Sequence, residues 1–159
     1  MTDQPDLAAR LDALEHRLQL AEDKLAIAQL IASYGPLVDA GRADEVGQLW
    51  TEDGEYDVEG WSMRSRADIH AMVLSDAHQR LITNGSVHFL GPVWVEVAGD
   101  EAKAVCDSLL VLNGEEGWRV ARGSVHRFQL VRDGGTWRIK HRISRQLDGS
   151  QSSRDLLPL

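Results

Sequence analysis

The strongest constraint on the fold is a change of hydrophobic period near residue 86. Before this point, apolar residues recur every three to four positions, as they do on one face of a helix. After it, apolar and polar residues alternate through long segments that end at turn residues, as in half-buried strands. Helices followed by a run of antiparallel strands predict an α+β fold. With 159 residues, the chain is long enough for one such domain with its own core.

The first 34 residues predict a helix. Its apolar positions alternate spacings of four and three, as in a heptad repeat: Leu7, Leu11, Leu14, Leu18, Ala21, Leu25 and Ala28. Such a seam packs either against a second chain or against the domain of its own chain, and three repeats do not decide between them. We expect a break at Gly35-Pro36, because proline lacks an amide donor and disfavours helical geometry in the preceding residue.

Shorter elements are predicted along the rest of the chain. They are a helix over 44–50 capped by Asp44, a turn over 52–54, a strand over 55–58, a helix over 66–77, a half-buried strand over 87–97 and strands over 103–112, 118–131 and 137–145. The polar tail from Asp148 is expected to lie on the surface or to be disordered. We therefore divide the chain into an N-terminal helical extension (1–24), a domain (25–147) and a C-terminal tail (148–159).

Charge and cysteine content limit the partners and sites to be expected. The chain has 17 basic and 25 acidic residues, a net charge of −8, whereas nucleic acids and anionic membranes attract a dense basic face. No apolar run is long enough to cross a membrane and no secretory signal is visible, so we expect a cytoplasmic protein. The single cysteine, Cys106, excludes an internal disulfide and predicts an inert buried thiol. No metal-ligand or nucleotide-binding motif is present.

Three residues suggest acid–base chemistry: Tyr34, Asp39 and His88. Tyr34 ends the helical stripe, Asp39 follows across the expected break, and His88 begins a strand. An imidazole beside a carboxylate is held in one tautomer and made more basic, which suits a general base. A phenol can donate a hydrogen bond to a substrate carbonyl. The alternative is structural, with His88 a satisfied strand residue and Asp39 a turn-closing one.

A second polar set lies on the last two predicted strands. The apolar alternation of Val120, Phe128 and Leu130 places Arg122, Ser124 and His126 on the same, core-facing side. In the last strand, His141 and Arg145 share the parity of Trp137, Ile139, Ile143 and Leu147, whereas Arg138, Lys140 and Arg142 predict a solvated face. Polar groups on a core face are costly unless they are paired or face a cavity. They predict either a wet pocket or a register that a bulge has shifted.

The order of segments along the chain resembles the SnoaL-like branch of the NTF2-like superfamily. The resemblance extends from about Leu25 to Leu147 and rests on LAIAQLIASYGPLVDAGRADEVGQLWTEDGEYDVEG, HFLGPVWVEVAGDEAKA and VHRFQLVRDGGTWRIKHRISRQLDG. It implies a curved sheet, mixed or antiparallel, that helices wrap into a cone, with a pocket between sheet and helices. Members of this kind include scytalone dehydratase, bile-acid 7α-dehydratase and a hexachlorocyclohexane dehydrochlorinase, commonly trimers, and dimeric ketosteroid isomerases. A homo-oligomer is therefore expected.

The resemblance also implies roles for individual residues. Asp39 and His88 match the aspartate–histidine pair that moves a proton without metal or cofactor in the dehydratase-like members, and Tyr34 matches a pocket tyrosine. Arg145 is a looser match to a pocket arginine, and Tyr56 is a further pocket phenol. The strand pattern alone adds three substrate-binding candidates, Arg122, His126 and His141.

We therefore expect a cofactor-independent lyase or isomerase that acts on a hydrophobic, oxygenated ring compound such as a steroid or polyketide. His88, oriented by Asp39, would remove a proton next to a carbonyl, and Tyr34 would stabilise the oxygen or protonate a leaving hydroxyl. Two alternatives belong to other classes of protein. One is a non-catalytic module that binds a small molecule. The other is a protein-interaction subunit that resembles the small subunit of ring-hydroxylating dioxygenases.

Overall fold

The computed structural model describes residues 4–158, with side chains described from residue 6. Its helices are α1 (Gln4–Asp39), α2 (Ala43–Gln48), α3 (Arg66–Leu74), α4 (Asp76–Asn84) and α5 (Gln151–Arg154). Its strands are β1 (Trp50–Val58), β2 (Trp61–Met63), β3 (Ser86–Leu90), β4 (Trp94–Ala98), β5 (Glu101–Gly114), β6 (Gly117–Asp133) and β7 (Thr136–Gln146). These strands form one sheet in the order β2-β1-β7-β6-β5-β3, with β4 paired to β5.

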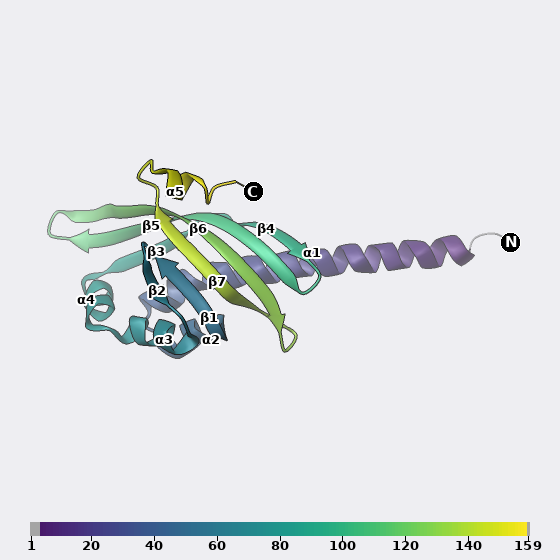
Figure 1. Cartoon of the computed structure of the whole chain (residues 1–159), viewed down its shortest axis with the longest axis horizontal. Helices are drawn as coiled ribbons and strands as arrows, with labels where there is room; N and C mark the ends of the chain where they lie inside the picture. The colour runs from purple at the N-terminus through teal and green to yellow at the C-terminus, as the bar shows by residue number, and fades with distance from the viewer. Residues whose placement is uncertain (1–3, 159) are drawn as a thin grey trace.

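The sheet is mixed and curved, and it determines the shape of the molecule. β1 runs parallel to β7, whereas the other neighbouring strands are antiparallel. Helices α1 to α4 lie on one side of the sheet and α5 lies on the other (Figure 1). The predicted α+β class and the cone that the family resemblance implied are therefore confirmed.

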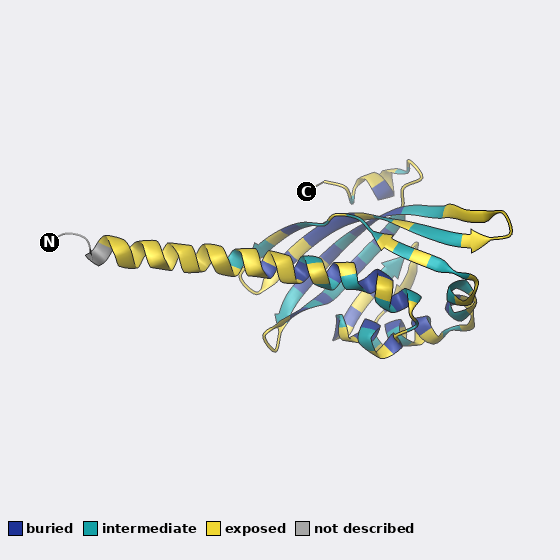
Figure 2. Ribbon diagram, turned by 180° about the vertical axis from the view of Figure 1, so that it is seen from behind, coloured by how far each residue is buried: buried dark blue, intermediate teal, exposed yellow. Residues whose placement is uncertain are grey.

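Helix α1 has two halves with different surroundings. Its first half extends away from the sheet and is exposed on every side, whereas its second half lies across the sheet (Figure 2). The second half buries Ile27, Ile31, Tyr34 and Val38, which recur at helical spacing. Within the described residues, no helix is both long and apolar enough to cross a membrane.

The expected break at Gly35-Pro36 is wrong, because α1 continues through both residues to Asp39. Burial of Val38, which is 0% exposed, holds the last turn in place. The amide of Ala40 donates to the carbonyl of Pro36 (3.1 Å) and extends the helical bonding past the proline. Gly35 serves a different purpose here: a side chain at this position would meet the carbonyl oxygen of His88 at 2.0 Å. The glycine therefore lets α1 approach β3.

Four of the shorter elements differ from prediction. The single strand expected over 87–97 is two strands, β3 and β4, which both pair with β5. Residues 52–54 do not form a turn but belong to β1, whose register against β7 shifts between Trp50 and Glu55. The single helix expected over 66–77 is two helices, separated at Ser75, whose hydroxyl accepts the His78 amide and so caps α4. Asp44 lies in the first turn of α2, because the helix begins one residue earlier and Arg42 precedes it.

Two β-bulges in the long strands change which residues face the helices. One shifts the pairing of β5 with β6 beside Leu110, and Val120, which was expected in the core, is 59% exposed. The other shifts β6 against β7 between Gln129 and Leu130, with Lys140 as the extra residue of β7. Beyond Lys140 the parity of β7 is inverted, so Arg142 is buried where a solvated face was predicted.

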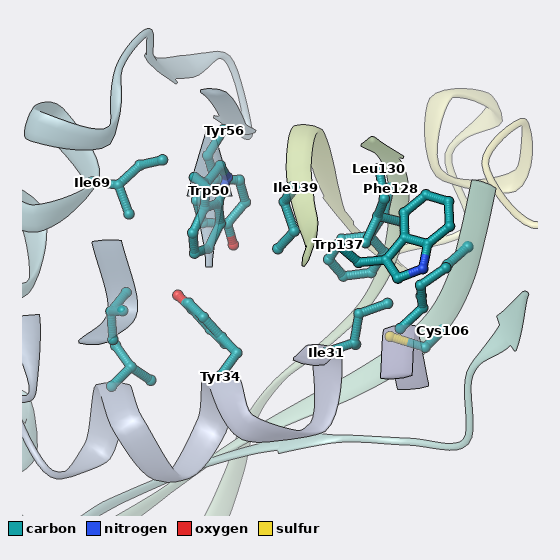
Figure 3. Packing of buried hydrophobic residues seen from close by; sticks show 14 of the residues in the cluster. Ile31, Tyr34, Trp50, Tyr56, Ile69, Cys106, Phe128, Leu130, Trp137 and Ile139 are labelled. Carbon is teal, nitrogen blue, oxygen red and sulfur yellow. The ribbon is translucent and has the colours of Figure 1, made fainter. Parts of the chain in front are cut away.

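The core fills the space between α1, β1 and the inner face of the sheet. Figure 3 shows Ile31 and Tyr34 of α1 packed below Trp50, Tyr56, Phe128 and Ile139 from the strands. Cys106 is buried in this core, and burial raises the pKa of its thiol to about 11. The C-terminal tail is packed rather than disordered, because Ser153 of α5 is fully buried.

Candidate functional site

Asp39 and His88 are joined by the close packing of α1 on β3. Asp39 is the last residue of α1, and His88 lies in the middle of β3. The Nδ1–H group of His88 donates to Oδ1 of Asp39 (2.6 Å), and the backbone amide of His88 donates to Oδ2 (2.7 Å). The Ser86 hydroxyl also donates to Oδ1 (2.8 Å). These three hydrogen bonds fix the carboxylate against one edge of the imidazole.

The same contacts keep Asp39 ionised and determine which ring nitrogen of neutral His88 carries the proton. Burial opposes ionisation of Asp39, but the hydrogen bonds from the His88 ring, the His88 amide and the Ser86 hydroxyl outweigh it and keep its pKa below the usual range. An ionised carboxylate only accepts hydrogen bonds, so Nδ1 carries the proton in neutral His88. His88 lines a cavity, and Nε2 is therefore the ring nitrogen with a lone pair for a ligand.

Tyr34 lies beside this histidine and projects toward the strands. Its ring is perpendicular to that of His88, with the ring centroids 6.4 Å apart, and it points toward Trp50 and Tyr56 (Figure 3). Burial raises the pKa of Tyr34 well above its usual value, and the neighbouring Tyr56 phenol raises it further. Tyr34 therefore stays protonated and is a hydrogen-bond donor over the whole physiological pH range.

A buried arginine forms the wall of the cavity on β7. Arg142 is 2% exposed, and its guanidinium carbon lies 4.2 Å from the Tyr34 ring centroid, 4.4 Å from that of Tyr56 and 5.2 Å from that of Phe128. Cation–π attraction to these faces offsets part of the cost of burying the charge. Its Nη1 group has no hydrogen-bond partner within residues 4–158. The inward orientation of Arg142 could not be predicted from the sequence, because the bulge that turns it inward leaves no simple signal in the alternation.

His126 links Arg142 to a serine hydroxyl. Nε and Nη2 of Arg142 donate to Nδ1 of His126 (3.3 and 3.2 Å), and Nε2 of His126 donates to Oγ of Ser108 (2.6 Å). Burial, and then the charges of Arg142 and Arg122, hold the pKa of His126 well below its ordinary value. His126 is therefore neutral, and its ring leaves the Ser108 hydroxyl proton free to donate elsewhere.

The cavity has a volume of about 170 Å³ and lies between the helices and the inner face of the sheet. Five of the predicted catalytic and substrate-binding residues line it: Tyr34, Tyr56, His88, Arg122 and His126. Its remaining walls are mainly apolar and include Val58, Met63, Met72, Leu90 and Leu110. A small apolar cavity with a few convergent polar groups is the usual form of a small-molecule site.

The β1–β2 hairpin contributes a solvent-exposed residue to the cavity wall. Trp61, at the start of β2, lines the cavity although it is 58% exposed. Arg122 donates to Glu59 (2.9 Å) and to the hydroxyl of Ser124 (2.8 Å), which ties the hairpin to β6. Arg122 is thus held in the cavity wall by neighbouring side chains.

His141 and Arg145 do not line the cavity. The inverted parity of β7 places Arg142 and Ser144 there instead. Arg145 makes a two-pronged ion pair with Asp57 (2.9 and 2.7 Å) across the β1–β7 pair. The prediction that both residues face the core was wrong, because the bulge at Lys140 separates them from Trp137 and Ile139.

Metal ligands do not cluster in the part of the chain that is described. Residues 4–158 contain no group of three or more His, Cys, Asp or Glu side chains arranged to hold a metal ion. The polar groups around the cavity suit proton transfer and hydrogen bonding by the side chains themselves.

Comparisons with solved structures support the architecture. An NTF2-like protein with a cystatin-like fold from Novosphingobium aromaticivorans is 40% identical, with a TM-score of 0.88, and the match covers 100% of this chain and 99% of that one. A hexachlorocyclohexane dehydrochlorinase from Novosphingobium barchaimii is 21% identical over 82% of this chain and 90% of its own, with a TM-score of 0.71. A Novosphingobium aromaticivorans protein described provisionally as a scytalone dehydratase is 19% identical over 80% and 85%, with a TM-score of 0.67.

The family comparison agrees with this result. A search of curated proteins finds no significant match. The family model described as the SnoaL-like domain matches residues 19–143, a range that includes Tyr34, Asp39, His88 and Arg142. The chain therefore belongs to the SnoaL-like family and has the NTF2-like fold.

Proposed function

We propose that this protein is a lyase or isomerase that removes a proton next to a carbonyl without a metal or cofactor. The observation that carries the proposal is the 2.6 Å contact between Asp39 and Nδ1 of His88 at the wall of a cavity that also contains Tyr34 and Arg142. This arrangement supplies a base whose lone pair faces a ligand and, nearby, two donors for a developing oxyanion.

In the proposed reaction, Nε2 of His88 takes the proton from the carbon next to the carbonyl. The C–H electron pair forms the enolate double bond, and the carbonyl π electrons move to oxygen. Arg142 and the protonated Tyr34 stabilise the negative oxygen, while Asp39 stabilises the imidazolium. In a dehydration the enolate then expels a hydroxyl from the next carbon, which leaves as water with the proton from His88. In an isomerisation the proton returns to a different carbon.

The size of the cavity bears on the substrate. A cavity of about 150 Å³ holds one benzene-sized ring, and this one has about 170 Å³. Of the ring compounds expected from the family resemblance, a single oxygenated ring, as in small polyketide-derived compounds, fits better than a four-ring steroid. The apolar walls suit the ring, and the polar groups suit its oxygens.

Exchange of carbon-bound hydrogen for solvent deuterium tests the proposal without knowledge of the final product. We expect the protein in D₂O to exchange the acidic C–H of one-ring cyclic ketones and hydroxyketones, observed by NMR. His88→Ala should lower this rate by roughly 10²–10⁴-fold, as expected for the loss of a general base. His70→Ala is the matched control, because His70 bonds Asp44 on the surface and is not part of the cavity.

The outcome also distinguishes the alternatives. Exchange that persists in a folded His88→Ala protein contradicts the assignment of the base. Ketone binding with no exchange in either protein favours a small-molecule-binding module instead. Absence of binding, combined with recovery of a stable larger partner, favours the protein-interaction subunit.

A further inference from the structure

The first half of α1 carries an apolar stripe that its own domain leaves uncovered. Leu7, Leu11, Leu14, Leu18 and Leu25 are between 50% and 60% exposed, although they occupy one face of the helix. Residues 6–19 are exposed on all sides, and this part of α1 extends away from the sheet (Figure 2). An exposed row of this kind marks an interaction site in a folded protein.

The domain holds α1 by a different face. The leucines occupy heptad positions a and d, with Leu11, Leu18 and Leu25 at a. Asp23, at position f, accepts hydrogen bonds from Trp137 (2.9 Å) and Arg132 (2.9 Å) and is buried. Because these contacts and the burial of Ile27 at position c use the opposite side of the helix, the a/d row is directed away from the domain.

The charges beside the stripe identify the partner. In this register, the e positions hold Glu15 and Glu22, and the g positions hold Arg10, Arg17 and Lys24. In a parallel pair, each g residue faces the e residue five positions further along the partner, so Arg10 meets Glu15 and Arg17 meets Glu22. In an antiparallel pair, g faces g and e faces e, which would bring like charges together. The pattern is therefore complementary to itself in the parallel orientation.

We propose that α1 forms a parallel, two-stranded coiled coil with α1 of a second copy of this chain, over residues 7–28. The remaining core positions, Ala21 and Ala28, are small and suit the narrow core of two strands, because a wider bundle would leave cavities around them. The helix already ends in a folded domain, so each copy presents the stripe in a fixed conformation. This interface is separate from the cavity and does not rest on the proposed enzymatic activity.

Molar mass in solution tests the interface. Light scattering of the full-length protein should give twice the chain mass of 17.6 kDa. The double substitution Leu11→Glu and Leu18→Glu should lower this mass two-fold. The matched control, Ala9→Glu and Ala13→Glu, adds the same charge on the outer side of the helix and should leave the mass unchanged. A wild-type monomer, or a mass that the leucine substitutions do not change, would overturn the proposal.

Charge reversal tests the orientation. Arg10→Glu with Arg17→Glu makes positions 10, 15, 17 and 22 all acidic and should weaken the dimer by repulsion. Glu15→Lys with Glu22→Lys makes the same four positions basic and should also weaken it. Mixing the two variants should restore a mixed dimer. One introduced cysteine, Leu14→Cys, should form an intermolecular disulfide under oxidising conditions, because only parallel strands bring the two copies of residue 14 together. Failure of both the mixing and the cross-link would rule out the parallel arrangement.

Discussion

The guanidinium of Arg142 is met by aromatic faces and a neutral histidine rather than by a carboxylate. Its contacts are the rings of Tyr34, Tyr56 and Phe128 and Nδ1 of His126. Burying a charge without an opposite charge costs free energy that this environment offsets only in part. That cost gives a physical reason to assign the positive charge to a ligand oxygen.

Replacing this charge should separate stability from activity. We expect Arg142→Met to lower the deuterium-exchange rate roughly 10²–10³-fold, since a donor to the developing oxyanion is lost. Its free energy of unfolding should stay equal or rise, because an apolar side chain of similar length avoids the desolvation cost. Arg142→Lys, which keeps the charge and loses the planar fork, should retain more activity than Arg142→Met. Full exchange by a folded Arg142→Met protein would contradict the role.

His126 should make stability depend on pH. Its pKa in the folded protein is well below 6.5, first because of burial and then because of the charges of Arg142 and Arg122. Below pH 6.5 the unfolded chain binds a proton at this residue and the folded protein does not, so the free energy of unfolding falls as pH decreases. Between pH 6.5 and 5.5 the wild type should lose up to about 1 kcal/mol more than His126→Gln.

Denaturant titrations of both proteins at several pH values measure this difference. Other groups with a lowered pKa, such as His78, are present in both proteins, so their contributions cancel in the comparison. Equal pH slopes for the two proteins would show that His126 is not kept neutral by the fold.

At the scale of secondary-structure elements, the crossing of α1 over β3 creates the candidate site. Gly35 lies at the point of closest approach, where a Cβ atom would be 2.0 Å from the carbonyl oxygen of His88. The same crossing brings Asp39 within hydrogen-bond distance of the His88 ring and amide. The distance between these two elements therefore controls the geometry of the proton-transfer pair.

Gly35→Ala should widen this crossing. The backbone oxygen cannot move aside independently, so we expect the free energy of unfolding to fall by roughly 1–3 kcal/mol. The Asp39–His88 hydrogen bond should lengthen, with a loss of deuterium exchange. Ala32→Gly on the exposed side of the same helix is the control and should cost about 1 kcal/mol with activity retained. An active Gly35→Ala protein of wild-type stability would contradict the packing argument.

The sequence predicted most of the helices and strands, but not the register in which neighbouring strands pair. The change of hydrophobic period near residue 86 predicted the helices and the long strands, because period depends on local side-chain order. That Arg142 faces the core could not be predicted in this way, because the bulge at Lys140 depends on the pairing between β6 and β7. The continuation of α1 past Pro36 depends on burial of Val38, which is also a tertiary contact.

At the scale of the whole molecule, one helix takes part in both proposed functions. The N-terminal half of α1 carries the leucine seam, and its C-terminal end carries Tyr34 and Asp39. The residues that line the cavity lie between Tyr34 and Ser144 and include none of the leucines of the seam. Assembly and proton transfer can therefore be tested separately in the same protein.

The tautomer of His88 is the most direct test of the central claim, that Asp39 holds this imidazole with Nε2 free to accept a proton. NMR chemical shifts of the ring nitrogens, measured with the His88 imidazole in its neutral form, should show a protonated, hydrogen-bonded Nδ1 and an unprotonated Nε2. In Asp39→Asn the preference for this tautomer should be lost. A proton on Nε2 of His88 in the wild type would leave no base facing the cavity and would contradict the mechanism.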